Sequence, residues 1–220
     1  DADGDGIPGG AGDALSDTDA LQIILAPVND TPIAVNDVAT AVEAGGTNNG
    51  TVGIDPRGNV LSNDIDVDIA TNADRLHLVS VAGTAVPLSG VAVITGQYGR
   101  LLIGSNGAYE YVVDNDNPAV QALRVSGQTL IENFSYVVAD LANAQSGAIL
   151  TVTLQGANDT PQGVDDDGVA VEAGGVFNGT PGSDATGNVL DNDSDVDSVA
   201  NGETRTVTAV RPVAEAGTGT

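Results

Sequence analysis

Two short acidic loops carry the residue types that bind hard metal cations. The stretch NDIDVD at 63–68 recurs as NDSDVD at 192–197. Carboxylates at alternate positions converge on one ion when the loop curls, as in many calcium loops. The candidate ligands in the two loops are Asn63, Asp64, Asp66, Asp68, Asp193, Asp195 and Asp197.

Other segments must complete the coordination shell, because Ca²⁺ takes about six to eight oxygen ligands. Glu43 and Glu172 lie in a repeated VEAGG, where the glycines allow a tight bend. The repeated NDTP motif adds further oxygens directly before a proline that ends a strand. An oxygen set there would clamp one module to the next. The residues concerned are Asn29, Asp30, Asn158 and Asp159.

A third candidate site lies at the beginning of the chain. DADGDG at 1–6 resembles the opening half of an EF-hand loop, with Asp1, Asp3 and Asp5 as ligands. The twelfth position is Gly12 rather than glutamate, and no helical pattern flanks the loop. We therefore expect a partial calcium loop here and not an EF-hand.

The alternative explanation for these acids is solubility combined with Asx turns, in which the side chain bonds its own backbone. The copies favour cation binding, because the acids keep their places while loop neighbours change. Ile65 becomes Ser194, and Ile69 becomes Ser198. The sequence thus predicts Ca²⁺ as the cofactor.

The acids belong to a tandem repeat with an offset of 129 residues, measured from Asn29 to Asn158. This spacing is longer than the repeat length of a propeller blade or a solenoid. It indicates separate domains that follow one another along the chain. We expect the end of a preceding module at 1–28, a complete module at 29–157, and the first half of a following module at 158–220. The chain would then be one segment of a longer array of modules.

Composition excludes several function classes. The 220 residues include 31 acidic and 6 basic ones, a formal charge of −25 that repels nucleic acids and anionic lipids. No apolar run approaches the ~20 residues of a membrane span. There is no cysteine for thiol chemistry, and a single histidine cannot build repeated catalytic sites. Acids in polar loops are expected to stay ionised, which argues against an acid pair for glycoside hydrolysis. We expect no enzyme.

Short β-prone segments must position these loops. The strongest are 76–81, 134–138 and 149–154, and 101–113 reads as a hairpin around Ser105-Asn106-Gly107. One helical turn is expected after Asn117, with Pro118 at its first position. Strands separated by Gly, Asn and Asp turns predict an all-β fold of tandem Ig-like or cadherin-like antiparallel β-sandwich modules.

Aromatic residues at strand spacing have two interpretations. Tyr109, Tyr111, Phe134 and Tyr136 would stack on sugars if they were exposed on one face of a sheet. At this spacing aromatic side chains are more often part of the core, which is the interpretation we favour.

The motifs resemble the VCBS repeat of very large bacterial surface proteins and, more loosely, bacterial cadherin-like domains. The matching stretches include VEAGG at 42–46, GNVLSNDIDVD at 58–68, NGAYEY at 106–111, AVQAL at 119–123, FSYVVAD at 134–140 and GANDTP at 156–161. The resemblance implies tandem Ig-like sandwiches in RTX-type adhesins that are secreted to the bacterial cell surface. It also implies a stalk made rigid by Ca²⁺, supporting adhesion or biofilm.

Two alternatives to a structural extender remain open. One is a binding module for glycan or protein. The other is a subunit of a self-assembling extracellular filament, because half a sandwich at 158–220 exposes strand edges that another copy could cover. The expected partners are neighbouring modules of the same chain and, for the filament, other copies.

Overall fold

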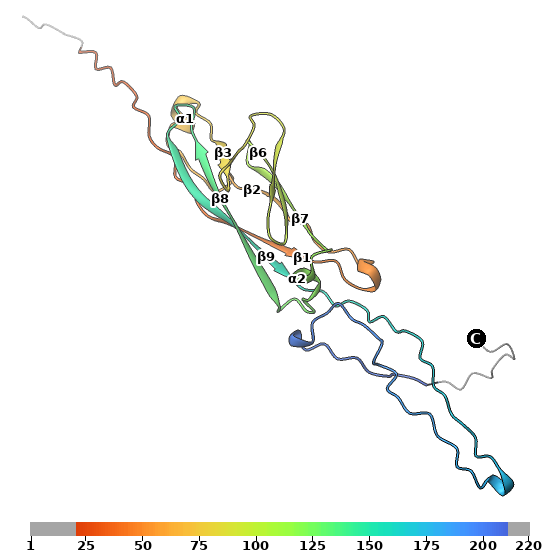
Figure 1. Ribbon diagram of the computed structural model, residues 1–220. Coiled ribbons are helices and arrows are strands. Elements are labelled where there is room, and N and C mark those ends of the chain that lie inside the picture. Colours follow the sequence, from red (N-terminus) through yellow and green to blue (C-terminus); the bar gives the residue numbers. More distant parts are fainter. Residues whose placement is uncertain (1–20, 211–220) are drawn as a thin grey trace, which may run out of the picture.

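The computed structural model describes residues 21–210, which form a long, narrow molecule (Figure 1). Asp1, Asp3 and Asp5 lie outside the described residues. Two facing sheets form a β-sandwich, with strand orders β1-β9-β8-β3-β4 and β2-β7-β6-β5. The strands are β1 (Asp37–Val42), β2 (Arg57–Asn59), β3 (His77–Val81), β4 (Thr84–Ala85), β5 (Val91–Thr95), β6 (Gly99–Gly104), β7 (Ala108–Val113), β8 (Thr129–Ala139) and β9 (Gln145–Gln155). The mostly antiparallel sheets confirm the predicted all-β sandwich.

Short helices occupy the connections. They are η1 (Thr47–Asn49), α1 (Asp68–Asn72), α2 (Pro118–Gln121), η2 (Val176–Asn178) and η3 (Val199–Asn201). The predicted turn after Asn117 is α2, whose cap is the Asn117 side chain accepting from the Ala119 amide at 2.9 Å. In the described part of the chain, no helix is both long and apolar enough to span a membrane.

The predicted hairpin is β6–β7, with Gly107 at φ 81° in its turn. Glycine suits this position because other residues rarely adopt positive φ. Tyr111 and Phe134 pack in the core with ring centroids 6.0 Å apart. Tyr136 is buried as well, and its hydroxyl donates to Asp37 Oδ2 at 2.8 Å. These three rings are therefore core residues and offer no platform for a sugar, while Tyr109 is partly buried against the same core.

One strand pair departs from the antiparallel prediction. β1 runs parallel to β9, from Asp37 beside Leu150 to Val42 beside Gln155. Both strands therefore end at the same pole of the sandwich, where the chain leaves for residues 158–210. Glu43 follows β1 directly, so its backbone amide donates to Gln155 O at 3.1 Å.

Residues 158–210 repeat the local structure of the first copy. The bridges Gln162–Ser194, Val171–Ser183 and Gly174–Thr180 match Ile33–Ile65, Val42–Ile54 and Gly45–Thr51 at the 129-residue offset. The chain runs outward, turns at η2 and returns to the sandwich (Figure 1). Apolar positions differ in burial: Val60 is fully buried, whereas its equivalent Val189 is 52% exposed. The division into modules at 1–28, 29–157 and 158–220 stays a prediction.

Candidate metal centres

The linker after β9 is held against the loop after β1. Gly46 N donates to Asn158 O at 2.8 Å, and Ala157 N donates to Glu43 Oε1 at 2.9 Å. A Cβ atom at Gly45 would lie 2.8 Å from Asn158 O, closer than real Cβ contacts come. The glycines of VEAGG therefore let the exit linker approach the loop that carries Glu43.

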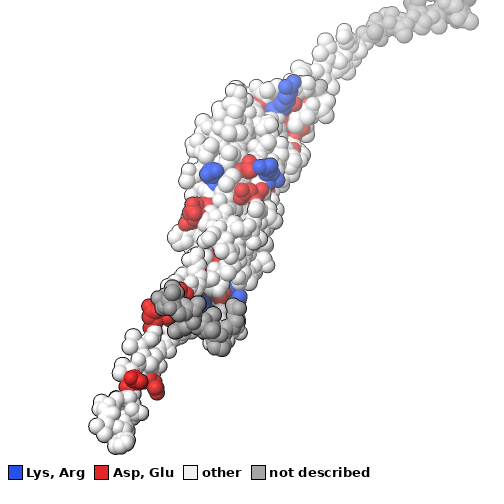
Figure 2. Space-filling model, turned by 90° about the vertical axis from the view of Figure 1, so that its right-hand side faces the viewer, with Lys and Arg blue, Asp and Glu red and all other residues white. Residues whose placement is uncertain are grey.

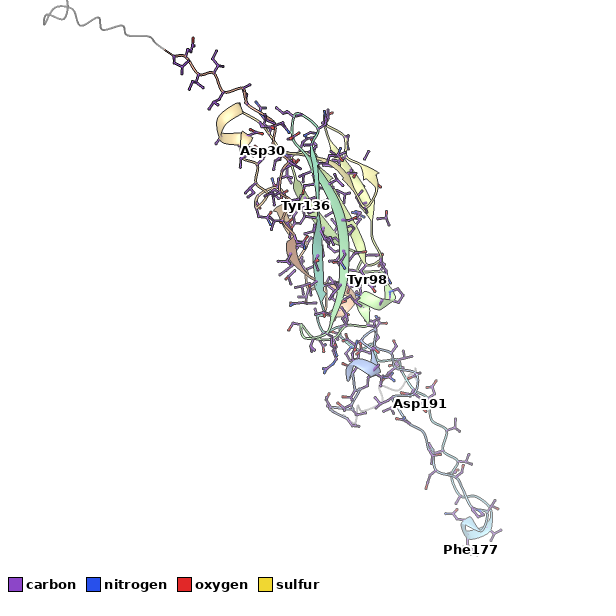
Figure 3. All side chains as sticks on the ribbon, turned by 90° about the vertical axis from the view of Figure 1, so that its left-hand side faces the viewer. Asp30, Tyr98, Tyr136, Phe177 and Asp191 are labelled. Carbon is purple, nitrogen blue, oxygen red and sulfur yellow. The ribbon has the colours of Figure 1, made fainter. Side chains whose placement is uncertain are left out.

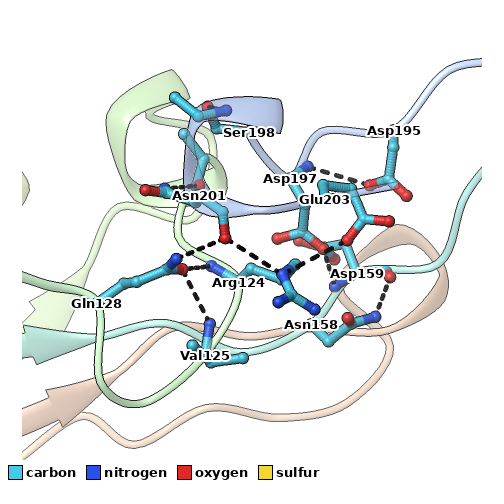
Figure 4. A network of polar contacts seen from close by, with 12 residues as sticks. Arg124, Val125, Gln128, Asn158, Asp159, Asp195, Asp197, Ser198, Asn201 and Glu203 are labelled. Atoms are coloured by element: carbon cyan, nitrogen blue, oxygen red, sulfur yellow. Dashed lines mark hydrogen bonds and ion pairs between the residues drawn. The ribbon is translucent and has the colours of Figure 1, made fainter. Parts of the chain in front are cut away.

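Five carboxylates meet at this pole, and we name them the junction cluster: Glu43, Asp159, Asp195, Asp197 and Glu203. Asp159 N donates to Asp197 Oδ2 at 2.8 Å, and Asp197 N donates to Asp195 Oδ1 at 3.0 Å (Figure 4). One oxygen from each of Asp195, Asp197 and Glu203 lies within 4.8 Å of the others. Glu43 is close enough to interact electrostatically with Asp159 and Asp197.

Three residues of the junction cluster are buried, and several oxygens of the cluster accept no hydrogen bond. Glu43, Asp159 and Asp197 are only 1%, 3% and 3% exposed. Among the described residues, four buried oxygens of the cluster have no donor: Glu43 Oε2, Asp159 Oδ2, Asp195 Oδ2 and Asp197 Oδ1. Burying an unpaired polar oxygen is costly, and grouped carboxylates raise that cost by mutual repulsion. These oxygens therefore indicate a site that a cation completes.

The same crowding changes how these groups titrate. Burial, reinforced by the charges of Asp159 and Asp197, raises the pKa of Glu43 to about 8. Burial and the charges of Asp197 and Asp195 raise the pKa of Asp159 to about 6. The expectation of permanently ionised acids is therefore wrong for Glu43 at neutral pH, because contact with the second copy buries a loop that is polar in sequence.

An equivalent cluster lies at the opposite pole. Asp66, Asp74 and Asp140 each place a carboxylate oxygen within 4.8 Å of the others. Asp68 Oδ2 accepts from Asp30 N at 2.8 Å, as Asp197 does from Asp159. Figure 3 shows Asp30 at this pole, with Phe177 at the far end of the molecule. The two clusters are therefore related but not identical: Asp66 and Asp74 correspond to Asp195 and Glu203, whereas Asp140 is the third member in place of the equivalent of Asp197.

Asn29 and Asp140 add a contact at the opposite pole. Asn29 Nδ2 donates to Asp140 Oδ2 at 2.7 Å, and this hydrogen bond lowers the pKa of Asp140. Asn29 Nδ2 also donates to Asp30 O at 2.8 Å, and in the second copy the side-chain amide of Asn158 makes the equivalent bond to Asp159 O. The two asparagines therefore brace the linker through their amide groups.

The first residues of each acidic loop lie apart from the clusters. Asp64 Oδ1 accepts from Val35 N at 2.7 Å, and Asp193 Oδ1 accepts from Val164 N at 2.8 Å. The Asn63 amide donates to Val35 O and Asn36 O. These side chains pin the acidic loop to the incoming linker. Glu172 is exposed, in the arm that leads to η2.

Asp74, Asp140 and Glu203 were missed in the sequence. Asp74 and Glu203 occupy equivalent positions at the 129-residue offset, so the repeat contained a signal for them. Changes between the copies hid it, because of the five residues before each of these acids only Asn72 and Asn201 are identical. No second copy of Asp140 lies within this sequence, so nothing in the repeat marked it.

The donor set suits a hard divalent cation. All candidate ligands are carboxylate oxygens, which Ca²⁺ prefers, and no histidine or cysteine takes part. A groove of about 340 Å³ bordered by Asp159 and Asp195 gives solvent access to the junction cluster. Figure 2 shows how sparsely basic side chains are spread over one face of the molecule. The described residues around the cluster thus fit Ca²⁺ better than a transition metal.

Comparison with known proteins shows the family of the sandwich. No curated protein matches the chain. One similar solved structure is a nucleoside hydrolase-related hypothetical protein from Saccharophagus degradans that is associated with carbohydrate metabolism. It is 14% identical with a TM-score of 0.30, covering 58% of this chain and 26% of that chain, so it carries no argument. The model of the bacterial cadherin-like domain matches residues 29–156. Such a domain indicates an extracellular adhesion-type module, and the chain belongs to the bacterial cadherin-like domain family.

Proposed function

We propose that this chain is a structural extender segment of a large secreted or cell-surface bacterial adhesin, made rigid by Ca²⁺ at its module junctions. The observation that carries the proposal is the set of four buried, unpaired carboxylate oxygens in the junction cluster. They come from both sides of the junction, since Glu43 belongs to one module and Asp195 and Asp197 to the next.

The residues act by electrostatics. Without a cation, the grouped carboxylates repel one another and favour separation of the two modules. Glu43, Asp159, Asp195, Asp197 and Glu203 would hold Ca²⁺ at this junction, and the ion would supply the positive charge that cancels their repulsion. Among the described residues, Arg124 is the only basic side chain that forms an ion pair with the cluster, with its Nε 3.7 Å from Glu203 Oε2. One arginine cannot neutralise five acids.

The expected affinity follows from the location. Calcium sites in extracellular modules bind at ~10⁻⁴–10⁻³ M. At a hundredfold excess over Kd, one site stabilises the folded chain by about 2.7 kcal/mol. For a chain of this size, that free energy corresponds to a rise in melting temperature of roughly 5–11 °C.

The test compares thermal unfolding in EDTA with unfolding in millimolar Ca²⁺, using Mg²⁺ as a control for ionic strength and hard-cation charge. We expect the melting temperature to rise with Ca²⁺ and to rise much less with Mg²⁺, which dehydrates reluctantly. Calorimetric titration gives the number of ions. An unchanged melting temperature in Ca²⁺ would contradict the proposal.

Further parts of the proposal rest on the resemblance to VCBS repeats in RTX-type adhesins. They are secretion to the bacterial surface, a stalk that holds a distal binding domain away from the cell, and support of adhesion or biofilm. A role without catalysis is part of the same proposal, because the contact between modules covers Glu43, the carboxyl with the most strongly raised pKa.

A further inference from the structure

The two modules also meet through groups that need no cation. The carbonyl of Ala122 accepts from Ser198 N at 3.2 Å and from the side-chain amide of Asn201. In return, Asn201 O accepts from Gln128 Nε2 at 2.7 Å and from Arg124 Nε at 3.4 Å. We name this set the clasp. It joins loop 122–128 of the sandwich to η3 of the next module.

Both halves of the clasp are shaped by contacts within their own module. Gln128 Oε1 accepts from the amides of Arg124 and Val125 at 2.8 and 3.2 Å, which closes loop 122–128. On the other side, Ser198 Oγ caps η3 by accepting from Ala200 N at 3.1 Å. Since each half is held before the modules meet, little conformational entropy is lost on docking.

The clasp is nearly independent of the acids beside it. Its four hydrogen bonds join main-chain carbonyls to one backbone amide, two side-chain amides and one guanidinium. Within the described residues, it is linked to the junction cluster by the ion pair between Arg124 and Glu203 and by a hydrogen bond from Glu203 N to Ser198 O at 3.3 Å, and Arg124 also interacts electrostatically with Asp197. Figure 4 shows Gln128 and Asn201 on one side of Arg124 and the carboxylates on the other.

The repeat keeps the part of the clasp that η3 contributes. Asn72 stands at the position equivalent to Asn201, whereas Ser198 is replaced by Ile69. The contact with Ala122 requires only the backbone amide of residue 198, which every residue except proline provides. A surface built from this asparagine and from main-chain groups can therefore recur at other junctions.

We propose that loop 122–128 is a cation-independent docking surface for the η3 turn of the following module. The junction is then a hinge with one permanent contact, and repulsion among the carboxylates opens it on the side of the cluster. This inference goes beyond calcium binding, because it predicts that an array without cation bends about a defined point and is not freely jointed.

Distances between spin labels test the clasp directly, since the chain has no cysteine. Labels at Ser135→Cys and Thr186→Cys, both exposed, report on the two modules. The variant Arg124→Ala/Asn201→Ala removes two side chains of the clasp. Gln128 is left in place, because its side chain also closes loop 122–128. Arg57→Ala is the matched control, because Arg57 pairs with Glu110 inside one module.

In EDTA, we expect the unsubstituted chain and Arg57→Ala to give a distribution of label-to-label distances that is broader than in Ca²⁺ but still confined to a limited range. The double variant should lower the ratio of docked to undocked junctions about 20-fold, since each net hydrogen bond is worth roughly a factor of five. In Ca²⁺, all three chains should give narrow distributions. If the double variant and the unsubstituted chain match in EDTA, the clasp is no docking surface and the inference is overturned.

Two safeguards keep the result interpretable. Hydrogen exchange of the β8–β9 amides checks that the sandwich of the double variant is folded. If it is not, Asn201→Ala alone repeats the measurement, because that change leaves the sequence of 29–157 intact. A distribution that does not respond to Ca²⁺ in the unsubstituted chain counts against calcium stiffening, whereas the clasp is judged from the EDTA comparison alone.

Discussion

Asp30 and Asp159 show how the environment decides the chemistry of one position in the repeat. Both backbone amides donate to the last aspartate of an acidic loop, at 2.8 Å in each case. Asp30 is exposed, whereas Asp159 is 3% exposed and has a pKa raised to about 6. Contact with the body of the sandwich makes this difference, because it brings Glu43 and its loop against Asp159.

At the residue scale, Asp197→Asn should have opposite effects with and without cation. Asparagine keeps the acceptor for Asp159 N but removes a charge that faces Asp159, Asp195 and Glu203. In EDTA we expect the melting temperature to rise by ~2–4 °C, the response to about 1 kcal/mol. In Ca²⁺ it should fall below that of the unsubstituted chain, with affinity reduced roughly ten- to hundredfold because ligand charge sets affinity.

Asp184→Asn is the control for this prediction, since Asp184 is exposed in the arm of the second copy. This substitution also removes one negative charge, but at a position outside the cluster. It should therefore leave calcium affinity unchanged. Equal effects of the two substitutions in calorimetric titration would mean that net charge, rather than the junction cluster, governs binding.

At the scale of elements, the parallel pairing of β1 with β9 is what assembles the site. It ends both strands at one pole, so the residues after each strand become neighbours although 114 positions separate Glu43 from Ala157. An antiparallel partner would place the end of β1 at the start of β9 and leave Glu43 far from the exit linker. The fold thus positions Glu43 through strand direction.

Gly45→Ala tests this placement. The added Cβ would meet Asn158 O at 2.8 Å and Ala157 Cβ at 3.0 Å, which pushes the linker away from Glu43. We expect the free energy of unfolding to fall by about 1–3 kcal/mol, as overpacking typically costs. Calcium affinity should fall as well, measured by titration at constant ionic strength.

Gly174→Ala provides the comparison, because Gly174 is the equivalent residue of the second copy. Nothing lies within 4 Å of a Cβ placed there, and neither glycine has positive φ. This substitution should leave stability and affinity nearly unchanged. A similar loss in both variants would point to backbone flexibility of the VEAGG motif and not to the approach of the linker.

At the scale of the whole molecule, stability should depend on pH in opposite ways with and without calcium. The pKa values of Glu43 and Asp159 are raised to about 8 and about 6, so the folded chain binds these protons more tightly than the unfolded chain. Without cation, the stability from these groups is therefore present at acidic pH and is lost as the pH rises from about 4 to about 8.

Melting temperatures in EDTA across this pH range check the prediction, with a second series in excess Ca²⁺. Protons and Ca²⁺ compete for the same oxygens, so the calcium-dependent gain should grow as the pH rises. A melting temperature in EDTA that climbs steadily from pH 4 to 8 would contradict the raised pKa values. Glu43→Gln should flatten the EDTA series, since glutamine cannot ionise.

Much of the local structure was predictable from sequence. The β6–β7 hairpin and the Asn117 cap of α2 follow from short-range turn and capping chemistry, which depends on few residues. α1 was missed, because its five residues are too few to show a helical period. The acidic loops were predicted as ligands, yet only their later members reach the clusters, since Asp64 and Asp193 bond the incoming linker instead.

The sequence by itself determined the repeat, the β-sandwich class and the chemical type of the ligands. These depend on residue identity and on periodicity, which are local properties of the chain. Tertiary structure alone decided which acids meet: Asp140 joins Asp66 and Asp74, and Glu203 joins Asp195 and Asp197. It also decided which carboxylates lose water, because burial of Glu43 depends on a parallel strand pair and on contact with the residues after β9. Long-range packing sets both, and no short pattern of residues encodes them.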